Sequence, residues 1–405
     1  MNNPPILDSV YSWQRLAITL LIATVGNVGM WSVIVVMPYV QSEFGLDRAD
    51  ASLPYTLTMV GFGLGNLFIG SAVDRMGVTR ALIAASLCIG AGFALAAISN
   101  SLLVLSVCQL IIGFGTAVSF GPLIADISHW FLRRRGIAVA IAASGNYLSG
   151  AIWPFILSGI LAESGWRAAY FVLAVSCIVI IVPLSLALRR RVPAAAADKA
   201  QSVSEANARS VNFSPRTLQL LLIVAGLACC MAMAMPQVHI VSLCADLGYG
   251  PAVGAEMLSL MLMGGVASRI VSGLIADKLG GVRTLLIGST LQCIALFLYL
   301  PYDGLVSLYV VSLIFGLSQG GIVPSYALIV REYLPAKEAG ARVGLVIMAT
   351  VIGMGLGGWM SGWIFVVTGS YQMAFINGIL WNMLNMAIMA MIFLKSRVRP
   401  PVAAI

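Results

Sequence analysis

The stretch Gly70-Ser-Ala-Val-Asp74-Arg75-Met-Gly77-Val-Thr-Arg80 recurs later in the chain as Gly273-Leu-Ile-Ala-Asp277-Lys278-Leu-Gly280-Gly-Val-Arg283. Gly273 follows Gly70 by 203 residues, and the same interval separates Gly316 from Gly113. This interval is half of the 405-residue chain. Self-similarity at a fixed interval indicates repeated structural units, so the sequence predicts two copies of one fold.

The composition is that of a membrane protein. Hydrophobic residues make up 60% of the chain and charged residues only 9%, against about 25% charged in soluble domains. Apolar runs of about 20 residues, long enough to cross the hydrocarbon as helices, recur throughout. We therefore expect an all-α integral membrane protein with twelve transmembrane helices in two six-helix pseudo-repeats. The expected spans are 16–40, 51–72, 79–98, 102–125, 136–160, 167–188, 217–243, 252–275, 283–300, 304–328, 341–366 and 370–394.

The positive charges are distributed unevenly between the two sets of loops. If the N-terminus is cytoplasmic, twenty of the 23 Lys and Arg residues, Arg15 among them, fall in cytoplasmic loops, and only Arg48 and Arg167 fall outside. The positive-inside rule then places both termini in the cytoplasm. The net charge of +8 follows from this topology and does not indicate a nucleic-acid partner. We expect a multi-pass protein of the plasma membrane, which in a bacterium is the inner membrane.

Three segments are expected along the chain. Residues 1–188 form an N-terminal six-helix half, residues 189–216 a basic, alanine-rich cytoplasmic linker, and residues 217–405 a C-terminal six-helix half. The other loops are too short for a catalytic or sensory domain. When two repeats of one membrane unit form a transporter, the substrate site lies between them near the bilayer midplane.

These features resemble the major facilitator superfamily, which has twelve helices in two halves and a Gly-x-x-x-Asp-(Arg/Lys)-x-Gly loop after helices 2 and 8. The resemblance covers the whole chain and implies the major facilitator fold. In that family the acidic residue of the loop lies beside a helix end and a basic residue and forms a cytoplasmic latch. This implies a gating role for the two loop pairs, which are Asp74 with Arg75 and Asp277 with Lys278.

A narrower resemblance is to the monocarboxylate porters and the oxalate/formate-type members. It rests on Trp130–Ala138 with Ala142–Gly145, on Gly165–Tyr170, on His239 and on Ser268-Arg269. In that group an arginine of helix 8 binds the substrate carboxylate, which implies this role for Arg269. The chain departs from the group at Gly265, where an acid is common. It also has no Lys or Arg in 343–366, where oxalate-type members carry a second cation.

Arg269 is the one basic residue that the expected topology assigns to no loop. A guanidinium inside the hydrocarbon is costly unless it faces a wet cavity or a partner, and such residues are functional by default. Since no acid lies within a turn of it on the expected helix, its counter-ion could be the substrate. Arginine suits a carboxylate because its planar fork gives two parallel hydrogen bonds. The alternative is a structural arginine paired with carbonyl groups or with a distant acid such as Asp126.

Histidine as a residue type titrates near neutral pH, so His239 could relay a proton, or it could be a satisfied hydrogen-bonding group near a helix end. Polar and aromatic residues in mid-span are further candidates for a substrate cavity, with packing as the alternative for each. These residues are Asn27, Trp31, Tyr55, Phe120, Asn146, Gln319, Tyr326 and Thr350.

No Asp or Glu falls in mid-span, whereas carriers of cations need such an acid. The sequence therefore favours a secondary active transporter that moves a small monocarboxylate such as lactate or pyruvate, together with a proton, by alternating access. The alternative is an exchanger or carrier of another organic anion, a dicarboxylate or an aromatic acid. No phosphate-binding loop, metal-ligand spacing or catalytic motif occurs, so we expect no enzyme activity, cofactor or metal. A monomer suffices for this fold.

Overall fold

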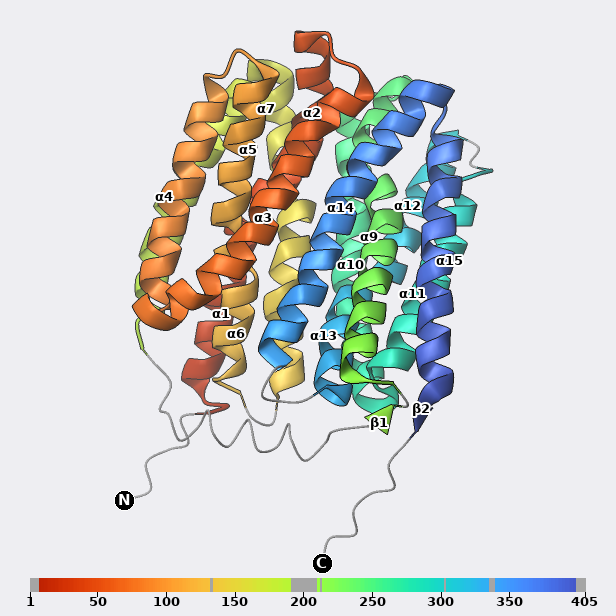
Figure 1. Cartoon of the computed structure of the whole chain (residues 1–405). Coiled ribbons are helices and arrows are strands. Elements are labelled where there is room, and N and C mark those ends of the chain that lie inside the picture. The colour runs from red at the N-terminus through yellow and green to blue at the C-terminus, as the bar shows by residue number, and fades with distance from the viewer. Residues whose placement is uncertain are drawn as a thin grey trace, which may run out of the picture.

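The computed structural model describes residues 7–131, 134–190, 210–211, 213–301, 304–334 and 339–397. Long helices run side by side along one direction and form a single bundle (Figure 1). Helix α1 begins and α15 ends at the same end of the bundle, which we call the terminal end; the opposite end is the far end. By length and composition, eleven helical stretches of the described chain could cross a membrane.

The first half of the chain forms the first six crossings. Its elements are α1 (Val10–Gly26), α2 (Val28–Phe44), α3 (Arg48–Met76), α4 (Val78–Ala97), α5 (Leu102–Thr116), the 3₁₀ turn η1 (Ala117–Ser119), α6 (Gly121–Ser128) and α7 (Arg135–Leu186).

The second half forms the other six crossings. Its elements are α9 (Pro215–Asp246), α10 (Pro251–Leu279), α11 (Gly281–Leu298), α12 (Gly304–Gln319), α13 (Ile322–Tyr333), α14 (Ala339–Thr368) and α15 (Tyr371–Lys395). Two short strands, β1 (Ser210–Val211) and β2 (Ser396–Arg397), pair antiparallel at the terminal end.

Helix α7 contains two of the twelve expected crossings. Its hydrogen bonding continues from Arg135 to Leu186, but Gly165 has φ 78° and ψ 174° and interrupts the helix. The positive φ is open to glycine and strained for other residues. Beyond this break, Trp166 and Arg167 both donate hydrogen bonds to the Glu43 carboxylate at the end of α2. The expected spans 136–160 and 167–188 are therefore present, and the eleven stretches make twelve crossings.

Three crossings are broken near their middle. The first is interrupted at Asn27, whose amide Nδ2 donates to the carbonyl oxygens of Ala23 (2.7 Å) and Ser119 (3.0 Å). The fourth is interrupted at η1, and the tenth at Gly320 and Gly321 between α12 and α13. The last two breaks are 203 residues apart, as Ala117 and Gly320 show.

Packing at glycines repeats the sequence interval in three dimensions. A Cβ added to Gly113 would lie 2.1 Å from the Thr58 carbonyl oxygen, and one added to Gly316 would lie 2.0 Å from that of Met261. Met261 follows Thr58 by 203 residues, as Gly316 follows Gly113. Helices α3 and α5 in the first half thus make the same backbone contact as α10 and α12 in the second half. Only glycine allows so close an approach.

The repeated loop motif ends α3 and α10 in the same way. Gly77 has φ 84° and its N–H donates to the Val73 carbonyl, while Gly280 has φ 83° and donates to that of Ala276. Arg75 and Lys278 are exposed at these helix ends. The side chains of Asp74 and Asp277 lie outside the described part of the structure, so the cytoplasmic latch stays a prediction.

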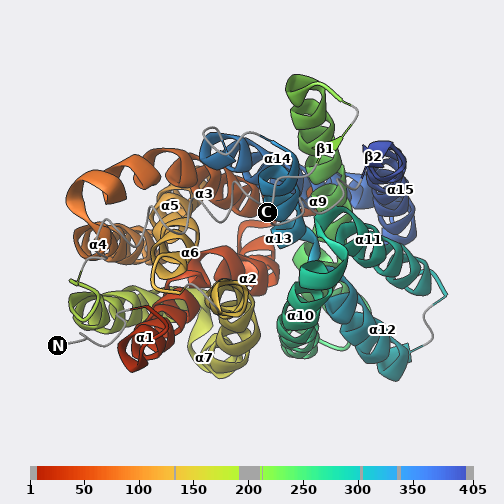
Figure 2. The same ribbon diagram turned by 90° about the horizontal axis from the view of Figure 1, so that it is seen from below.

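The two halves lie side by side when the bundle is viewed from below (Figure 2). Helix α3 packs against α14, α7 against α10, and α2 against α9. Since each contact joins one half to the other, these three helix pairs form the interface at which any substrate site between the repeats must lie.

One expectation about the topology is wrong. Arg15 was expected in a cytoplasmic loop, but α1 begins at Val10 and Arg15 is only 1% exposed. Its guanidinium donates two hydrogen bonds of 2.9 Å to the Asp126 carboxylate of α6 and lies 4.7 Å from the centre of the Trp130 ring. This bidentate pairing offsets the cost of burying the charge inside the bundle.

We expect Gly316→Ala to destabilise the protein, because the added methyl group would force α10 and α12 apart at the Met261 carbonyl. Overpacking of this kind costs roughly 1–3 kcal/mol. The measurement is the midpoint of thermal unfolding of the purified protein in detergent. Gly159→Ala is the matched control, since a Cβ there meets nothing within 4 Å. Equal midpoints for the two variants would contradict the proposed packing.

Candidate functional site

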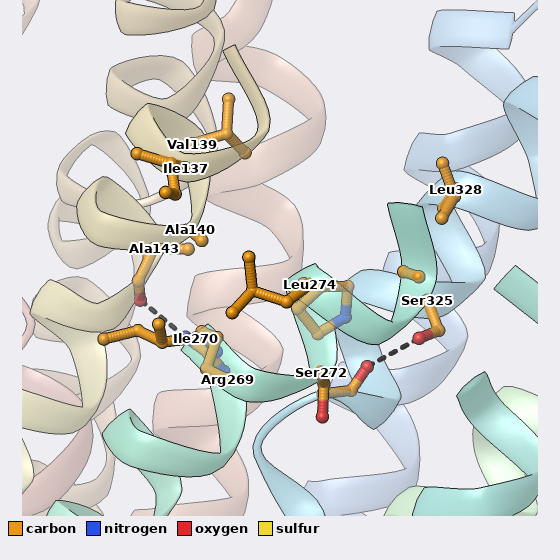
Figure 3. A pocket seen from close by; sticks show the side chains of 14 residues that line it. Ile137, Val139, Ala140, Ala143, Arg269, Ile270, Ser272, Leu274, Ser325 and Leu328 are labelled. Atoms are coloured by element: carbon orange, nitrogen blue, oxygen red, sulfur yellow. Dashed lines mark hydrogen bonds between the residues drawn. The ribbon is translucent and has the colours of Figure 1, made fainter. Parts of the chain in front are cut away.

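A cavity of about 160 Å³ lies between the two halves, between α7 on one side and α10 and α13 on the other (Figure 3). Most of its wall is apolar. Arg269 is the charged residue that lines it, and Ser272 and Ser325 add two hydroxyl groups. The other lining residues are Ile137, Val139, Ala140, Ala143, Ile270, Gly273, Leu274, Ala276, Gly321, Pro324 and Leu328.

Arg269 is buried in the wall of this cavity, with only 4% of its surface exposed. Its Nε donates to the Gly320 carbonyl oxygen at 3.1 Å, and its Nη1 donates to that of Ala143 at 2.5 Å. Both acceptors are uncharged, so they satisfy hydrogen bonds and leave the positive charge in place. Asp126, the distant acid considered from the sequence, is paired with Arg15. None of the ion pairs among the described residues includes Arg269.

Close backbone contacts hold Arg269 in position. A Cβ on Gly320 would lie 2.1 Å from the Gly265 carbonyl oxygen and 2.7 Å from the Arg269 nitrogen. The backbone between α12 and α13 is therefore in direct contact with α10, and its Gly320 carbonyl points toward the guanidinium. Glycine at this position is required for the geometry of the site.

Tyr147 of α7 contacts Arg269 in this site, although no sequence pattern distinguishes it from the other aromatic residues of the apolar segments. The Arg269 Cζ atom lies 4.0 Å from the centre of the Tyr147 ring. The Trp31 ring meets Tyr147 edge-on at 6.4 Å, and Trp31 Nε1 donates to the Asn146 side-chain oxygen at 2.8 Å. The structure thus brings three predicted residues together, Trp31, Asn146 and Arg269, through an aromatic ring that joins the two halves.

Of the predicted substrate-binding residues, only Arg269 is among the described residues that line the cavity; Trp31 and Asn146 lie outside the lining, and so do five other candidates. The Asn27 amide is used at the break in the first crossing, and Phe120 packs against Phe62 at 6.0 Å. Gln319 accepts a hydrogen bond from Gln237, the Tyr326 hydroxyl donates to Asn385 at 2.7 Å, and Thr350 donates to the Ile347 carbonyl. In this conformation these side chains make contacts within their own half.

His239 and Tyr55 meet at a different place, against Gly358 of α14. His239 is fully buried; its Nε2 lies 2.7 Å from the Gly358 carbonyl oxygen, and its Nδ1 lies 3.2 Å from the Tyr371 hydroxyl. A Cβ on Gly358 would lie 3.1 Å from the Tyr55 ring. Both ring nitrogens of His239 have partners, and neither His239 nor Tyr55 lines the Arg269 cavity.

An ion pair joins the halves at the far end of the bundle. The Arg48 guanidinium donates to both Asp246 carboxylate oxygens, at 2.6 and 2.7 Å, and lies 5.4 Å from the centre of the Phe365 ring. Arg48 was expected in an outer loop, and this pair was not predicted, because its members are 198 residues apart in the sequence. The Arg269 cavity lies toward the terminal end of α10. An ion pair therefore joins the two halves at the far end, whereas the cavity lies toward the terminal end.

The described residues contain no cluster of three or more His, Cys, Asp or Glu side chains that could hold a metal ion.

Comparisons with known proteins agree with this architecture. Residues 19–305 and 220–404 match the family model of the Major Facilitator Superfamily. Monocarboxylate transporter 13 of Bos taurus is 30% identical over 319 residues, which is 76% of this chain and 72% of the relative. Agnestins efflux protein AgnL12 of Paecilomyces divaricatus is 24% identical over 353 residues, or 84% and 78% of the two chains.

Among solved structures, a bacterial homolog to the human lysosomal transporter Spinster, in an inward-facing and occupied conformation, has the same fold. The TM-score is 0.73 at 15% identity, and the match covers 97% of this chain and 100% of that chain.

We expect Arg48→Gln and Asp246→Asn each to loosen the far end, because either change removes the ion pair between the halves. Ser242→Cys, in a variant without the seven native cysteines, reports this opening, since Ser242 is buried against Met37 of the other half. In either variant, Cys at position 242 should react severalfold faster with a maleimide in detergent than in the parent protein. A double variant with the two charges exchanged, Arg48→Asp with Asp246→Arg, should restore the slow rate.

Arg167→Gln is the control for this experiment. It breaks the Arg167–Glu43 ion pair (2.6 Å), which lies at the same end but within the first half. If breaking either pair changed the labelling rate equally, the Arg48–Asp246 pair would have no particular role in holding the halves together.

Proposed function

We propose that this chain, which belongs to the Major Facilitator Superfamily, carries a small monocarboxylate across a membrane together with a proton, by alternating access. Members of this superfamily are transporters and not enzymes, and the chain is a multi-pass membrane protein. The substrate class is our inference. It is supported by the similarity to proteins named monocarboxylate transporters and, above all, by the state of Arg269.

Arg269 carries the proposal because it is a buried cation that forms no ion pair with an acid among the described residues. A charge taken out of water and left unpaired is strongly destabilising, and polar carbonyl groups compensate only part of that cost. An incoming carboxylate would supply the missing negative charge and two acceptor oxygens in the geometry of the guanidinium fork. An anion should therefore bind where Arg269 meets the cavity.

The cavity suits a small monoanion. An apolar protein cavity of about 150 Å³ holds a benzene molecule, and lactate and pyruvate have the same number of non-hydrogen atoms as benzene. The volume here is about 160 Å³. Its apolar wall would contact the methyl group of such an acid, and the hydroxyls of Ser272 and Ser325 are polar groups near the charge. A dicarboxylate would need a second cation, which the cavity lining does not contain.

Substrate binding would also change the net charge of the site. The empty carrier holds one uncompensated positive charge at Arg269, and a bound monoanion neutralises it. The empty and loaded carriers then differ in the cost of reorienting within the membrane. We propose that a proton accompanies the anion and that His239 relays it, since an imidazole nitrogen can both accept and release a proton.

The topology is part of the same proposal. We place the terminal end in the cytoplasm and the protein in the plasma membrane, because the positive-inside rule favours this orientation. We divide the chain into halves 1–188 and 217–405 joined by the linker 189–216, of which residues 191–209 lie outside the described structure. The fold is complete in one chain, so we propose a monomer.

Another organic anion is the alternative substrate. Arg269 would anchor any carboxylate, and one relative is named an agnestins efflux protein. A larger or aromatic acid would then extend beyond the cavity seen in this conformation.

We expect purified protein in proteoliposomes to take up labelled lactate, pyruvate or acetate when an inward proton gradient is applied. Arg269→Ala should reduce this uptake at least about thirtyfold, because loss of a buried charged contact to the substrate costs roughly 2–5 kcal/mol. Arg283→Ala is the matched control, since Arg283 is an exposed arginine that stacks on Phe393 away from the cavity. It should transport at the wild-type rate.

Full uptake by Arg269→Ala would remove Arg269 from the mechanism and overturn the proposed anion site. If the wild-type protein moved none of the three acids but did move a larger one in an Arg269-dependent way, the alternative substrate class would be correct.

We expect His239→Gln to abolish the stimulation of uptake by an inward proton gradient, with transport without a gradient retained. Glutamine can still donate a hydrogen bond to the Gly358 carbonyl, but it does not titrate. The measurement is the rate of uptake against external pH. A profile identical to that of the wild type would show that His239 is a structural residue held by Gly358 and Tyr371.

A further inference from the structure

The Tyr147 ring occupies the space between two residues that lie one turn apart on α10. The Arg269 Cζ atom is 4.0 Å from the ring centre, and a Cβ on Gly265 would lie 2.8 and 2.9 Å from two ring carbons. Tyr147 itself is buried, with 4% of its surface exposed. The ring is therefore packed directly against α10, with the guanidinium over its face.

This geometry is that of a cation–π interaction. A guanidinium within about 6 Å of a ring centre is attracted to the negative face of the ring, and the attraction strengthens when the pair is removed from water. The ring has no net charge, so it attracts the guanidinium without neutralising it. A carboxylate at the same place would also hold Arg269, but it would cancel the charge that a substrate anion needs.

The ring also excludes an acid from the neighbouring turn. Because a Cβ at Gly265 would overlap the ring, no side chain fits there while Tyr147 keeps its position. The glycine and the tyrosine are thus complementary parts of one arrangement, although they lie on helices of different halves. This explains physically why the turn before Arg269 carries no carboxylate.

The ring is in turn held from behind. Trp31 meets it edge-on, and the Trp31 indole nitrogen donates to both the side-chain and backbone oxygens of Asn146, at 2.8 and 2.9 Å. Gly150 leaves room for Trp31, since a Cβ there would lie 2.6 Å from an indole carbon. Trp31 and Asn146 therefore act on Arg269 through Tyr147 in this conformation.

We propose that Tyr147 is the positioning residue for Arg269: it fixes the guanidinium at the cavity and leaves its positive charge available to the substrate carboxylate. This inference rests on the proposed function. The two carbonyl bonds, to Ala143 and Gly320, fix the guanidinium along its edge, and the ring fixes its face. Since Tyr147 and Ala143 belong to α7, the anion site is complete only when α7 and α10 are in contact.

The test compares Tyr147→Phe with Tyr147→Leu in the uptake of labelled lactate into proteoliposomes. Phenylalanine keeps the aromatic face, so its KM should stay within about threefold of the wild-type value. Leucine keeps apolar bulk without a quadrupole, so its KM should rise about tenfold or more with a smaller change in kcat. Phe393→Leu, which removes the ring beside Arg283 at 5.5 Å, is the matched control and should leave KM unchanged.

A second measurement separates electrostatics from packing. Phenylalanine analogues with one, two or three ring fluorines, inserted at position 147, weaken the negative face stepwise and barely change the shape. We expect log KM to rise with each fluorine. A merely structural ring would give one constant KM across the series.

The outcomes distinguish this inference from the function on which it rests. If the wild-type protein takes up lactate in an Arg269-dependent way but Tyr147→Leu has the wild-type KM, or the fluorine series is flat, the role of Tyr147 is overturned alone. If the wild-type protein takes up no monocarboxylate, the proposed function fails and this inference fails with it.

Discussion

The architecture depends on how closely helix backbones can approach one another. Lipid gives helices no hydrophobic reason to associate, so packing must come from contact, and small residues allow the closest contact. Within each half, glycines face backbone carbonyls: a Cβ at Gly61 or Gly113 would lie 2.0–2.1 Å from one, and Gly316 repeats this in the second half. Such contacts leave no room for adjustment, and each half is accordingly expected to move as a unit.

Most contacts between the halves are of a different kind, although a Cβ on Gly362 of α14 would lie 2.8 Å from the Arg48 carbonyl oxygen of the first half. On α14, Gly357 faces the Met231 carbonyl of its own half at 2.6 Å, whereas Gly355 and Gly358 face side-chain atoms of Met59 and Tyr55 at 3.2 and 3.1 Å. Side chains can turn aside where a backbone cannot. The Arg48–Asp246 ion pair adds strength at the far end, but an ion pair can dissociate into water as the ends separate. Away from Gly362, the interface that would open under the proposed alternating access is therefore the more adjustable of the two.

The fold could be predicted from the sequence because two of its properties can be read along the chain. The lengths of the apolar segments predict the membrane crossings, and the 203-residue interval predicts two similar halves. The sequence missed the features that depend on contacts between distant residues. Arg15 was assigned to a loop because the expected apolar span began at residue 16, and its buried pairing with Asp126, 111 residues away, was not visible in the sequence. Arg269 was found because a charge in an apolar segment stands out. Tyr147 was missed because an aromatic residue in such a segment looks the same whether it packs against lipid, another helix or a guanidinium.

The structure describes three buried arginines, and the comparison between them bears on function. Arg15 is paired with Asp126 by two hydrogen bonds, and Arg48 with both oxygens of Asp246. Arg269 is equally buried, but its partners among the described residues are two carbonyl oxygens and Tyr147, none of which is an acid. Where a buried arginine holds helices together, this protein supplies an acid. At Arg269 the space in which an acid could stand, beside Gly265, is filled by a neutral ring. Specific packing thus leaves this charge without an acid among the described residues, and a buried charge of this kind, in a cavity between the two halves, is the property that the proposed anion transport would require.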